Sequence, residues 1–190
     1  MPDVTISEAL DLGTDTTGLG LEEPVYAEVV NALCSPLFHH ERVHGDDFEI
    51  LLDNVIEAAT ALDDLKKVLF YGRLPAQPAP TFSASFAYER VHPDIVHAIV
   101  GIITEAGELA ERLLKMGKEP NEDHRPNLVE ESGDLGWYVQ LLRNRLAITS
   151  SHERLINARK LFKRYPEKVF AATRAAERNL AAEAEVLKDG

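Results

Sequence analysis

Two short acidic motifs in this chain have 22 residues between them, counted from Glu108 to Glu131. The first, in TEAGELAER, provides Glu105 and Glu108, and the second, in VEESGDLGW, provides Glu131 and Asp134. Carboxylates three positions apart lie on one side of a helix. Four of them brought together repel one another unless a cation neutralises them, and Mg²⁺ prefers oxygen ligands and commonly bridges to phosphates. The spacing therefore predicts a Mg²⁺ or Mn²⁺ site that acts on a phosphorylated substrate.

A helical wheel places each acidic pair at the border of an apolar stripe. At about 100° per residue, Glu131 borders the stripe of its segment and Asp134 lies about 60° further round. The stripes consist of Ile95, Ile102, Ala106, Leu109 and Leu113 in the first segment and Leu128, Leu135, Val139, Leu142 and Leu146 in the second. We expect both stripes to be buried and the four carboxylates to converge between packed helices. A solvated helix flank is the alternative for either pair alone, and two matched pairs favour the metal site.

The elements that must position these carboxylates are helices. Four segments have apolar residues at helical spacing, namely 24–37, 47–70, 93–116 and 128–146. The last third is rich in alanine and charge and is interrupted at Tyr165-Pro166. Because no segment alternates as a strand does, the sequence predicts an all-α fold. Residues 1–22 are expected to form a flexible N-terminal segment and residues 23–188 a single domain.

The bulk composition argues against several classes of protein. A net charge of -12 opposes broad electrostatic binding to nucleic acid or to an anionic membrane. Cys34 is the only cysteine, which excludes an internal disulfide and a thiolate metal cluster. No apolar run approaches the length of a membrane span, and the first residues lack the basic start of a signal peptide. We therefore expect a cytoplasmic protein.

Three segments, in this order, resemble the MazG-like all-α nucleoside triphosphate pyrophosphohydrolases of bacteria and phages. HAIVGIITEAGELAERLLK (97–115) is similar to the metal-binding second helix of that family, and NLVEESGDLGWYVQLL (127–142) to its third. NARKLFKRYPEKVF (157–170) is similar to the family's Asn-x-x-Lys-Leu-x-x-Arg-Tyr-Pro segment. The resemblance implies a fold like a four-helix bundle with an extra N-terminal segment. It implies Mg²⁺-dependent hydrolysis of nucleoside triphosphates, deoxy or non-standard ones among them, to monophosphate and pyrophosphate.

The resemblance also assigns roles to individual residues. The implied metal ligands and catalytic residues are Glu105, Glu108, Glu131 and Asp134, and one of these or Glu130 orients or deprotonates the attacking water. The implied phosphate contacts are Asn157, Lys160, Arg164 and Tyr165, with a solvated basic flank as the alternative. Lys115 is a further candidate for contacting the phosphates, with a solvated lysine at a helix end as the alternative. Many family members have a second Glu directly before that pair, where this chain has Thr104, so the number of ions is left open.

The sequence also leads to expectations about subunit contacts and about alternative functions. The family is usually homo-oligomeric with sites built between subunits, so the resemblance implies at least a homodimer that takes a nucleoside triphosphate as substrate. One alternative is a non-catalytic helical module that binds a nucleotide or a partner, and another is a pyrophosphohydrolase acting on a related phosphoribosylated nucleotide. A di-iron carboxylate bundle needs Glu-x-x-His twice, whereas this chain offers only Asp94-x-x-His97. Trp137 is expected to pack against the helices rather than stack on a base.

Overall fold

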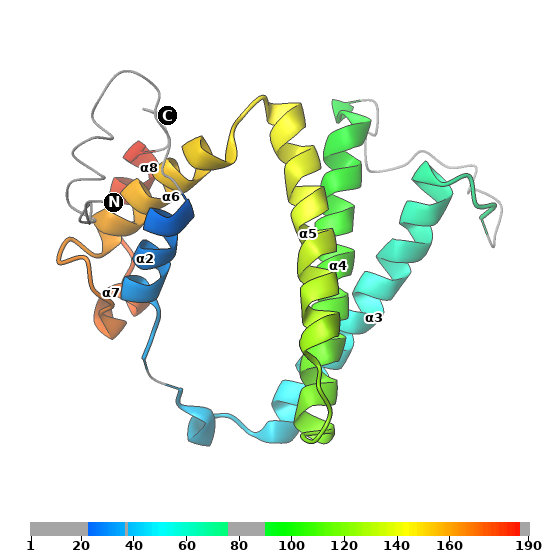
Figure 1. Cartoon of the computed structure of the whole chain (residues 1–190), viewed down its shortest axis with the longest axis horizontal. Helices are drawn as coiled ribbons and strands as arrows, with labels where there is room; N and C mark the ends of the chain where they lie inside the picture. Colours follow the sequence, from blue (N-terminus) through cyan, green and yellow to red (C-terminus); the bar gives the residue numbers. More distant parts are fainter. Residues whose placement is uncertain (1–22, 37, 76–89, 187–190) are drawn as a thin grey trace. The chain divides into compact units, whose positions relative to one another are not determined.

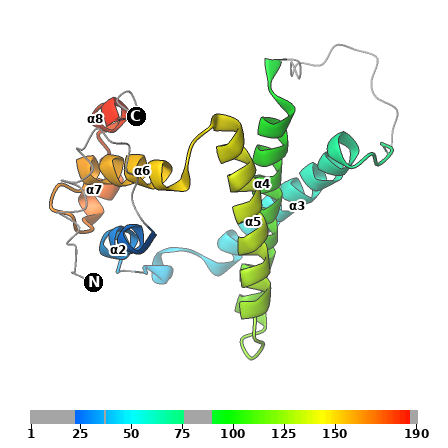
Figure 2. The same ribbon diagram turned by 45° about the horizontal axis from the view of Figure 1, so that its top comes forward.

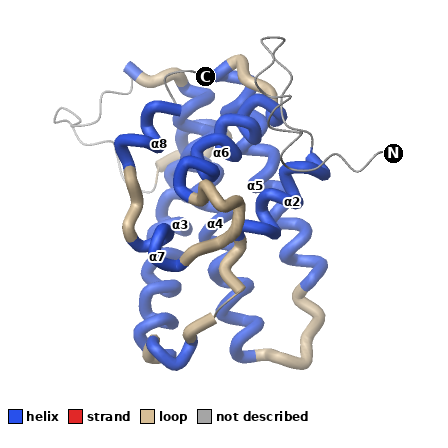
Figure 3. Tube along the Cα trace, turned by 90° about the vertical axis from the view of Figure 1, so that its left-hand side faces the viewer, coloured by secondary structure: helices blue, strands red, loops and turns tan. Residues whose placement is uncertain are grey.

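The computed structural model describes residues 23–36, 38–75 and 90–186. In these ranges the chain forms seven α-helices and one short 3-10 helix, and no strand occurs in them (Figure 3). The helices are α2 (Glu23–Leu33), η2 (His40–Arg42), α3 (Gly45–Phe70), α4 (Pro93–Lys118), α5 (Arg125–Leu146), α6 (Ser150–Arg164), α7 (Ala172–Ala176) and α8 (Leu180–Val186). The predicted all-α class is confirmed, and the expected flexible segment 1–22 lies outside the described residues.

The described helices are distributed over two compact units. The central unit covers residues 40–147 and contains α3, α4 and α5. The terminal unit combines the described residues up to His39 with those from Ile148 onward, and it contains α2, α6, α7 and α8. The region predicted as a single domain contains both units. None of the described helices combines the length and the apolar character that crossing a lipid bilayer requires.

In the central unit α4 packs against both of the other helices, with α3 along one side and α5 along another (Figures 1 and 2). Small residues allow this close approach. A Cβ added at Gly107 would lie 2.2 Å from the Cβ of Ala59 on α3. A Cβ added at Gly101 would lie 2.1 Å from the ring of Tyr138 on α5. Glycine at both positions therefore sets the distance between α4 and its neighbours.

The prediction that the apolar stripes of α4 and α5 are buried is wrong in part. Leu113 and Leu146 are 45% and 51% exposed, and Ala106 is exposed as well. The buried residues of the two helices are instead Ala98, Gly101, Thr104, Glu105, Gly107, Glu131 and Tyr138. Because α4 packs through its small residues, the buried face is centred on these residues. Glu105 and Glu131 consequently lie inside the packed face rather than at its border.

The ends of α4 and α5 follow from local chemistry. Pro93 occupies the first turn of α4, and the Nδ1 of His92 accepts a hydrogen bond of 3.2 Å from the backbone N–H of Asp94. The helix continues through Gly117 to Lys118, two residues beyond the predicted end at 116. Helix α5 ends at Leu146, because the next residue, Ala147, adopts a left-handed conformation with φ of 55°.

The terminal unit has a small apolar core and a buried ion-pair group. Its core consists of Val29 with Leu155 and Ala158, and partly buried Val25, Tyr26, Leu33 and Phe162 pack around it. On α8 the buried carboxylate of Glu183 accepts hydrogen bonds from Arg164 Nε at 2.9 Å and from Arg164 Nη2 at 2.8 Å. Arg178 Nη2 donates a third at 2.6 Å. These two guanidinium groups lower the pKa of Glu183 to about 2.

Candidate metal centre

Three of the four predicted carboxylates converge between α4 and α5. Glu105 comes from α4, and Glu131 and Asp134 come from α5, one turn apart. One carboxylate oxygen from each lies within 4.8 Å of the others. Glu105 and Glu131 are buried and Asp134 is exposed, so the group has one member that faces solvent. Oxygen atoms grouped in this way suit a hard divalent cation, which takes carboxylate and water ligands.

Glu108, the fourth predicted carboxylate, lies at the edge of this group. Burial and a hydrogen bond with Glu131 raise the pKa of Glu108 to about 7, and the charges of Glu105 and Asp63 act in the same direction. Burial also raises the pKa of Glu105, although Lys66 opposes the increase. Burial is the largest cause of both increases, and repulsion from the neighbouring carboxylates adds to it at Glu108. A divalent cation bound here would offset this repulsion.

Two basic side chains contact the cluster from α4 and α3. The Nε of Arg112 donates to Glu131 Oε1 over 3.4 Å. Lys66 on α3 is only 4% exposed, and its Nζ lies 3.5 Å from Glu105 Oε1. Neither residue was predicted from the sequence. No sequence signal indicated Lys66, because only the structure shows that the face of α3 with Ala59 and Lys66 packs against α4.

Lys66 has three oxygen atoms from three residues around its ammonium group. Besides Glu105, its Nζ lies 2.9 Å from Thr104 Oγ1 and 3.0 Å from Asp63 Oδ1. Its Nζ also lies over the ring of Tyr138, 5.1 Å from the centroid. Burial by itself would lower the pKa of Lys66, but the neighbouring Asp63 and Tyr138 raise it to about 12. The ammonium group is therefore a charged and fixed part of the centre.

A cleft between α3 and α4 leads to one side of the carboxylate cluster. Its volume is about 170 Å³, and it is lined by Ile56, Ala59, Thr60, Asp63, Thr104, Gly107, Glu108 and Glu111. Pockets that enclose whole small molecules have volumes of roughly 300–1,000 Å³. The cleft of a single chain is thus too small to enclose a nucleotide.

The predicted phosphate contacts belong mostly to the terminal unit, on or directly after α6. The Oδ1 of Asn157 accepts a 3.1 Å hydrogen bond from the hydroxyl of Tyr26. Arg164 is engaged by Glu183, Tyr165 is buried, and Lys160 is partly buried. Lys115 lies in the central unit on α4, where its Nζ is 2.6 Å from Glu111 Oε1. The structure therefore groups the carboxylates in one unit and the α6 residues in the other.

An aromatic cluster surrounds His97 near the start of α4. The imidazole is stacked on Phe70 with ring centroids 4.1 Å apart, and its Nε2 lies 3.3 Å from the hydroxyl of Tyr71. Trp137 and Tyr138 both present their rings edge-on to His97. Burial lowers the pKa of His97, which favours the neutral imidazole. Trp137 makes these ring contacts while its side chain is 57% exposed, so the expected packing role applies to one side of the ring only.

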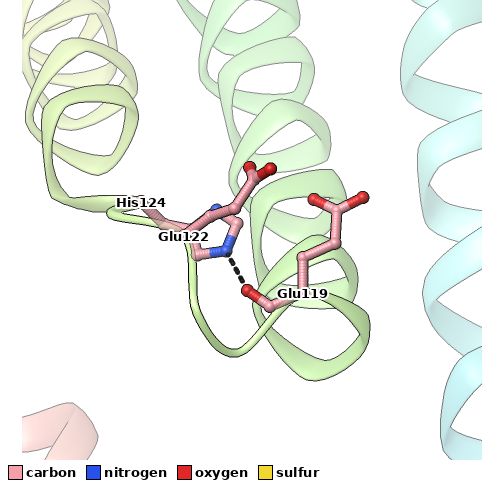
Figure 4. Close-up of side chains that lie close together, drawn as sticks. All are labelled: Glu119, Glu122 and His124. Atoms are coloured by element: carbon pink, nitrogen blue, oxygen red, sulfur yellow. Dashed lines mark hydrogen bonds between the residues drawn. The ribbon is translucent and has the colours of Figure 1, made fainter.

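A second group of possible metal ligands occurs in the loop between α4 and α5. Glu119, Glu122 and His124 each offer one ligand atom, and these atoms lie within 4.8 Å of one another (Figure 4). Both glutamates are exposed, and the Nε2 of His124 is 3.0 Å from the carbonyl oxygen of Glu119. That hydrogen bond explains the position of His124 as part of the turn. We assign no function to this group, because exposed acidic groups are common without an ion.

No family model, curated protein or solved structure matches this chain.

Proposed function

We propose that this protein is a MazG-like nucleoside triphosphate pyrophosphohydrolase with a fold like a four-helix bundle. It would hydrolyse deoxy or non-standard nucleoside triphosphates to the monophosphate and pyrophosphate. The observation that carries this proposal is the convergence of Glu105, Glu131 and Asp134, from two helices, with carboxylate oxygens within 4.8 Å of one another. Sequence spacing suggested that convergence independently of any structure, and the motifs that contain these residues resemble those of the family.

Each residue of the centre has a role in the proposed reaction. Glu105, Glu131 and Asp134 would hold the Mg²⁺ or Mn²⁺ ion, with Glu108 beside them. When bound, the ion neutralises negative charge on the phosphate oxygens of the substrate. Glu108, at the edge of the cluster, is placed where it can take part in binding the ion or in orienting water, and Arg112 keeps Glu131 in position. Asn157, Lys160, Arg164, Tyr165 and Lys115 remain the proposed contacts to the phosphates.

The composition of the centre favours this reaction over the alternatives. A di-iron bundle requires histidine ligands among the carboxylates, whereas the grouped ligands here are all carboxylates and His97 is enclosed by aromatic rings. Oxygen-only ligands are typical of Mg²⁺ and Mn²⁺. A non-catalytic nucleotide-binding module is disfavoured because all four carboxylates are present. A phosphoribosylated nucleotide would use the same groups and is separated from the proposal only by experiment.

The proposal is tested by measuring pyrophosphate release from a panel of ribo- and deoxyribonucleoside triphosphates. With Mg²⁺ we expect equimolar monophosphate and pyrophosphate, and with excess chelator we expect none. The panel also identifies the preferred base and sugar. Release of inorganic phosphate without pyrophosphate would contradict the proposed site of cleavage. Binding of Mg²⁺ without turnover of any nucleotide in the panel would favour the binding module or a phosphoribosylated substrate.

We further propose that two copies of the chain pair through α3. One face of this helix contacts α4, as the contacts of Ala59 and Lys66 indicate. A second face carries apolar residues spaced alternately by three and four positions, as in the seam between two packed helices. Its positions are 48, 51, 55, 58, 62, 65 and 69. Five of its side chains are 47–64% exposed in the single chain, namely Phe48, Leu51, Val55, Leu65 and Leu69. The same face on a second copy would cover it symmetrically.

Light scattering tests this pairing. We expect the wild type to have at least twice the 21.1 kDa mass of one chain. The double substitution Leu51→Glu and Leu65→Glu should reduce the measured mass to that of one chain, because each glutamate would place a charge in an apolar seam. Ile50→Glu is the matched control, since Ile50 is exposed on the same helix but lies off the seam. A wild-type mass of one chain in the active species would contradict the pairing.

A further inference from the structure

Lys66 occupies a position in the metal centre that resembles the position of a bound cation. Its Nζ lies within 3.5 Å of oxygen atoms from Asp63, Thr104 and Glu105, which come from two helices. Two of these residues, Thr104 and Glu105, are buried and adjacent in the sequence. Oxygen atoms grouped in this way are the ligands that a divalent cation would use. A second ion that shared Glu105 with Asp63 and Thr104 would have to displace the ammonium group.

The charges around the cluster also argue against a second divalent ion. Five carboxylates gather here, those of Asp63, Glu105, Glu108, Glu131 and Asp134. Two basic groups that are less exposed than Lys67 contact them, those of Lys66 and Arg112. Because the pKa of Glu108 is about 7, this carboxyl group is only partly ionised near neutral pH, so at most three negative charges are left over, and one divalent ion would neutralise most of them. A second divalent ion would make the centre positive before any phosphate had bound, and the two ions would repel each other at short distance.

We propose that Lys66 is a built-in cation of the metal centre, which limits the centre to one divalent ion per chain while no nucleotide is bound. The proposal rests on the proposed function in one respect, since it takes Glu105, Glu131 and Asp134 as the ligands of that ion. Lys66 is a positioning residue, because it acts on the ion through Glu105 and through its own charge. It is buried against α4, so its effect does not require contact with the substrate.

The test is the number of Mn²⁺ ions that each protein binds without nucleotide, measured by electron paramagnetic resonance of free Mn²⁺ and by calorimetry. We expect one ion per chain for the wild type. Lys66→Met keeps the length of the side chain but removes its charge and its three contacts. We expect two ions per chain for this variant, because the oxygens of Asp63, Thr104 and Glu105 become available. Lys66→Arg restores the charge and should bind one ion.

Lys67→Met is the matched control, since it removes the same charge from the next residue. Lys67 contacts Asp63 but is 43% exposed at its side chain, so its charge is screened by solvent. Lys67→Met should still bind one ion. This result would show that the number of ions depends on the position of the charge at residue 66 and not on the total charge of the centre. Two ions in the wild type, or one ion of unchanged affinity in Lys66→Met, would overturn the proposal for Lys66 alone. No ion in the wild type would overturn the proposed function as well. Circular dichroism checks folding, and if Lys66→Met does not fold, the wild-type number decides.

Discussion

Replacing Glu131 by glutamine is expected to lower the proposed Mg²⁺-dependent pyrophosphate release by about 10²–10³-fold, a loss typical of removing one charged or donor group that acts directly in the centre. Glu131 is buried, and one of its oxygens lies within 4.8 Å of ligand atoms of Glu105 and Asp134. Glutamine has nearly the same shape and keeps an oxygen that can accept the hydrogen bond from Arg112. The substitution therefore removes a charge from the centre with little change in packing.

Steady-state kinetics over a range of Mg²⁺ concentrations distinguishes the cause of this loss. If Glu131 is a ligand, more Mg²⁺ should restore part of the activity of Glu131→Gln, because the affinity for the ion is lowered. Glu57→Gln makes the same chemical change at an exposed position of α3 and should retain wild-type activity. An unchanged rate in Glu131→Gln, with the fold verified by circular dichroism, would show that the carboxylate group does not act in hydrolysis.

Gly107→Ala is expected to lower the free energy of unfolding by about 3 kcal/mol, at the upper end of the usual cost of overpacking a core. The new Cβ would lie 2.2 Å from the Cβ of Ala59, and a Cβ cannot rotate away as the end of a long side chain can. The clash between the two Cβ atoms can therefore be relieved only by a shift of α3 relative to α4. Because Lys66 lies on the same face of α3, the shift would also disturb its contacts with Thr104 and Glu105.

Denaturant unfolding of two further variants tests the steric explanation. Ala59→Gly combined with Gly107→Ala removes the opposing Cβ and should recover most of the lost stability, apart from the cost of glycine in a helix. Gly133→Ala introduces the same methyl group on α5, where no atom lies within 4 Å. It should stabilise the protein by about 0.5–1 kcal/mol through helix propensity. Equal destabilisation by Gly107→Ala with and without Ala59→Gly would exclude the contact as the cause.

The helices and the acidic pairs were predictable because both depend on local spacing. Residues three positions apart face the same way on a helix wherever the helix packs, so Glu131 and Asp134 form a pair in any tertiary arrangement. The buried face was not predictable in the same way. Wheel positions of Leu113 and Leu146 indicated burial, but Gly101 and Gly107 determine which side of α4 approaches its neighbours. Glycine adds nothing to an apolar stripe, so its effect on packing is invisible to hydrophobic periodicity.

Lys66 and Arg164 show why long-range contacts escaped sequence reasoning. A lysine is usually interpreted as solvated, and only the tertiary packing of α3 on α4 reveals that Lys66 is buried among acids. Arg164 was predicted to contact phosphate, and that role stays a prediction. Its ion pair with Glu183 depends on the path of the chain after Tyr165, which no local pattern specifies.

The aromatic cluster has a consequence for spectroscopy. Trp137 is the only tryptophan of the chain, and its ring packs edge-on to Tyr138 with centroids 4.9 Å apart. It lies three residues after Asp134, one turn further along α5. Indole fluorescence of this protein therefore has a single origin, next to the carboxylate cluster. Quenching and emission wavelength can report on ion binding and on helix movement there without an attached dye.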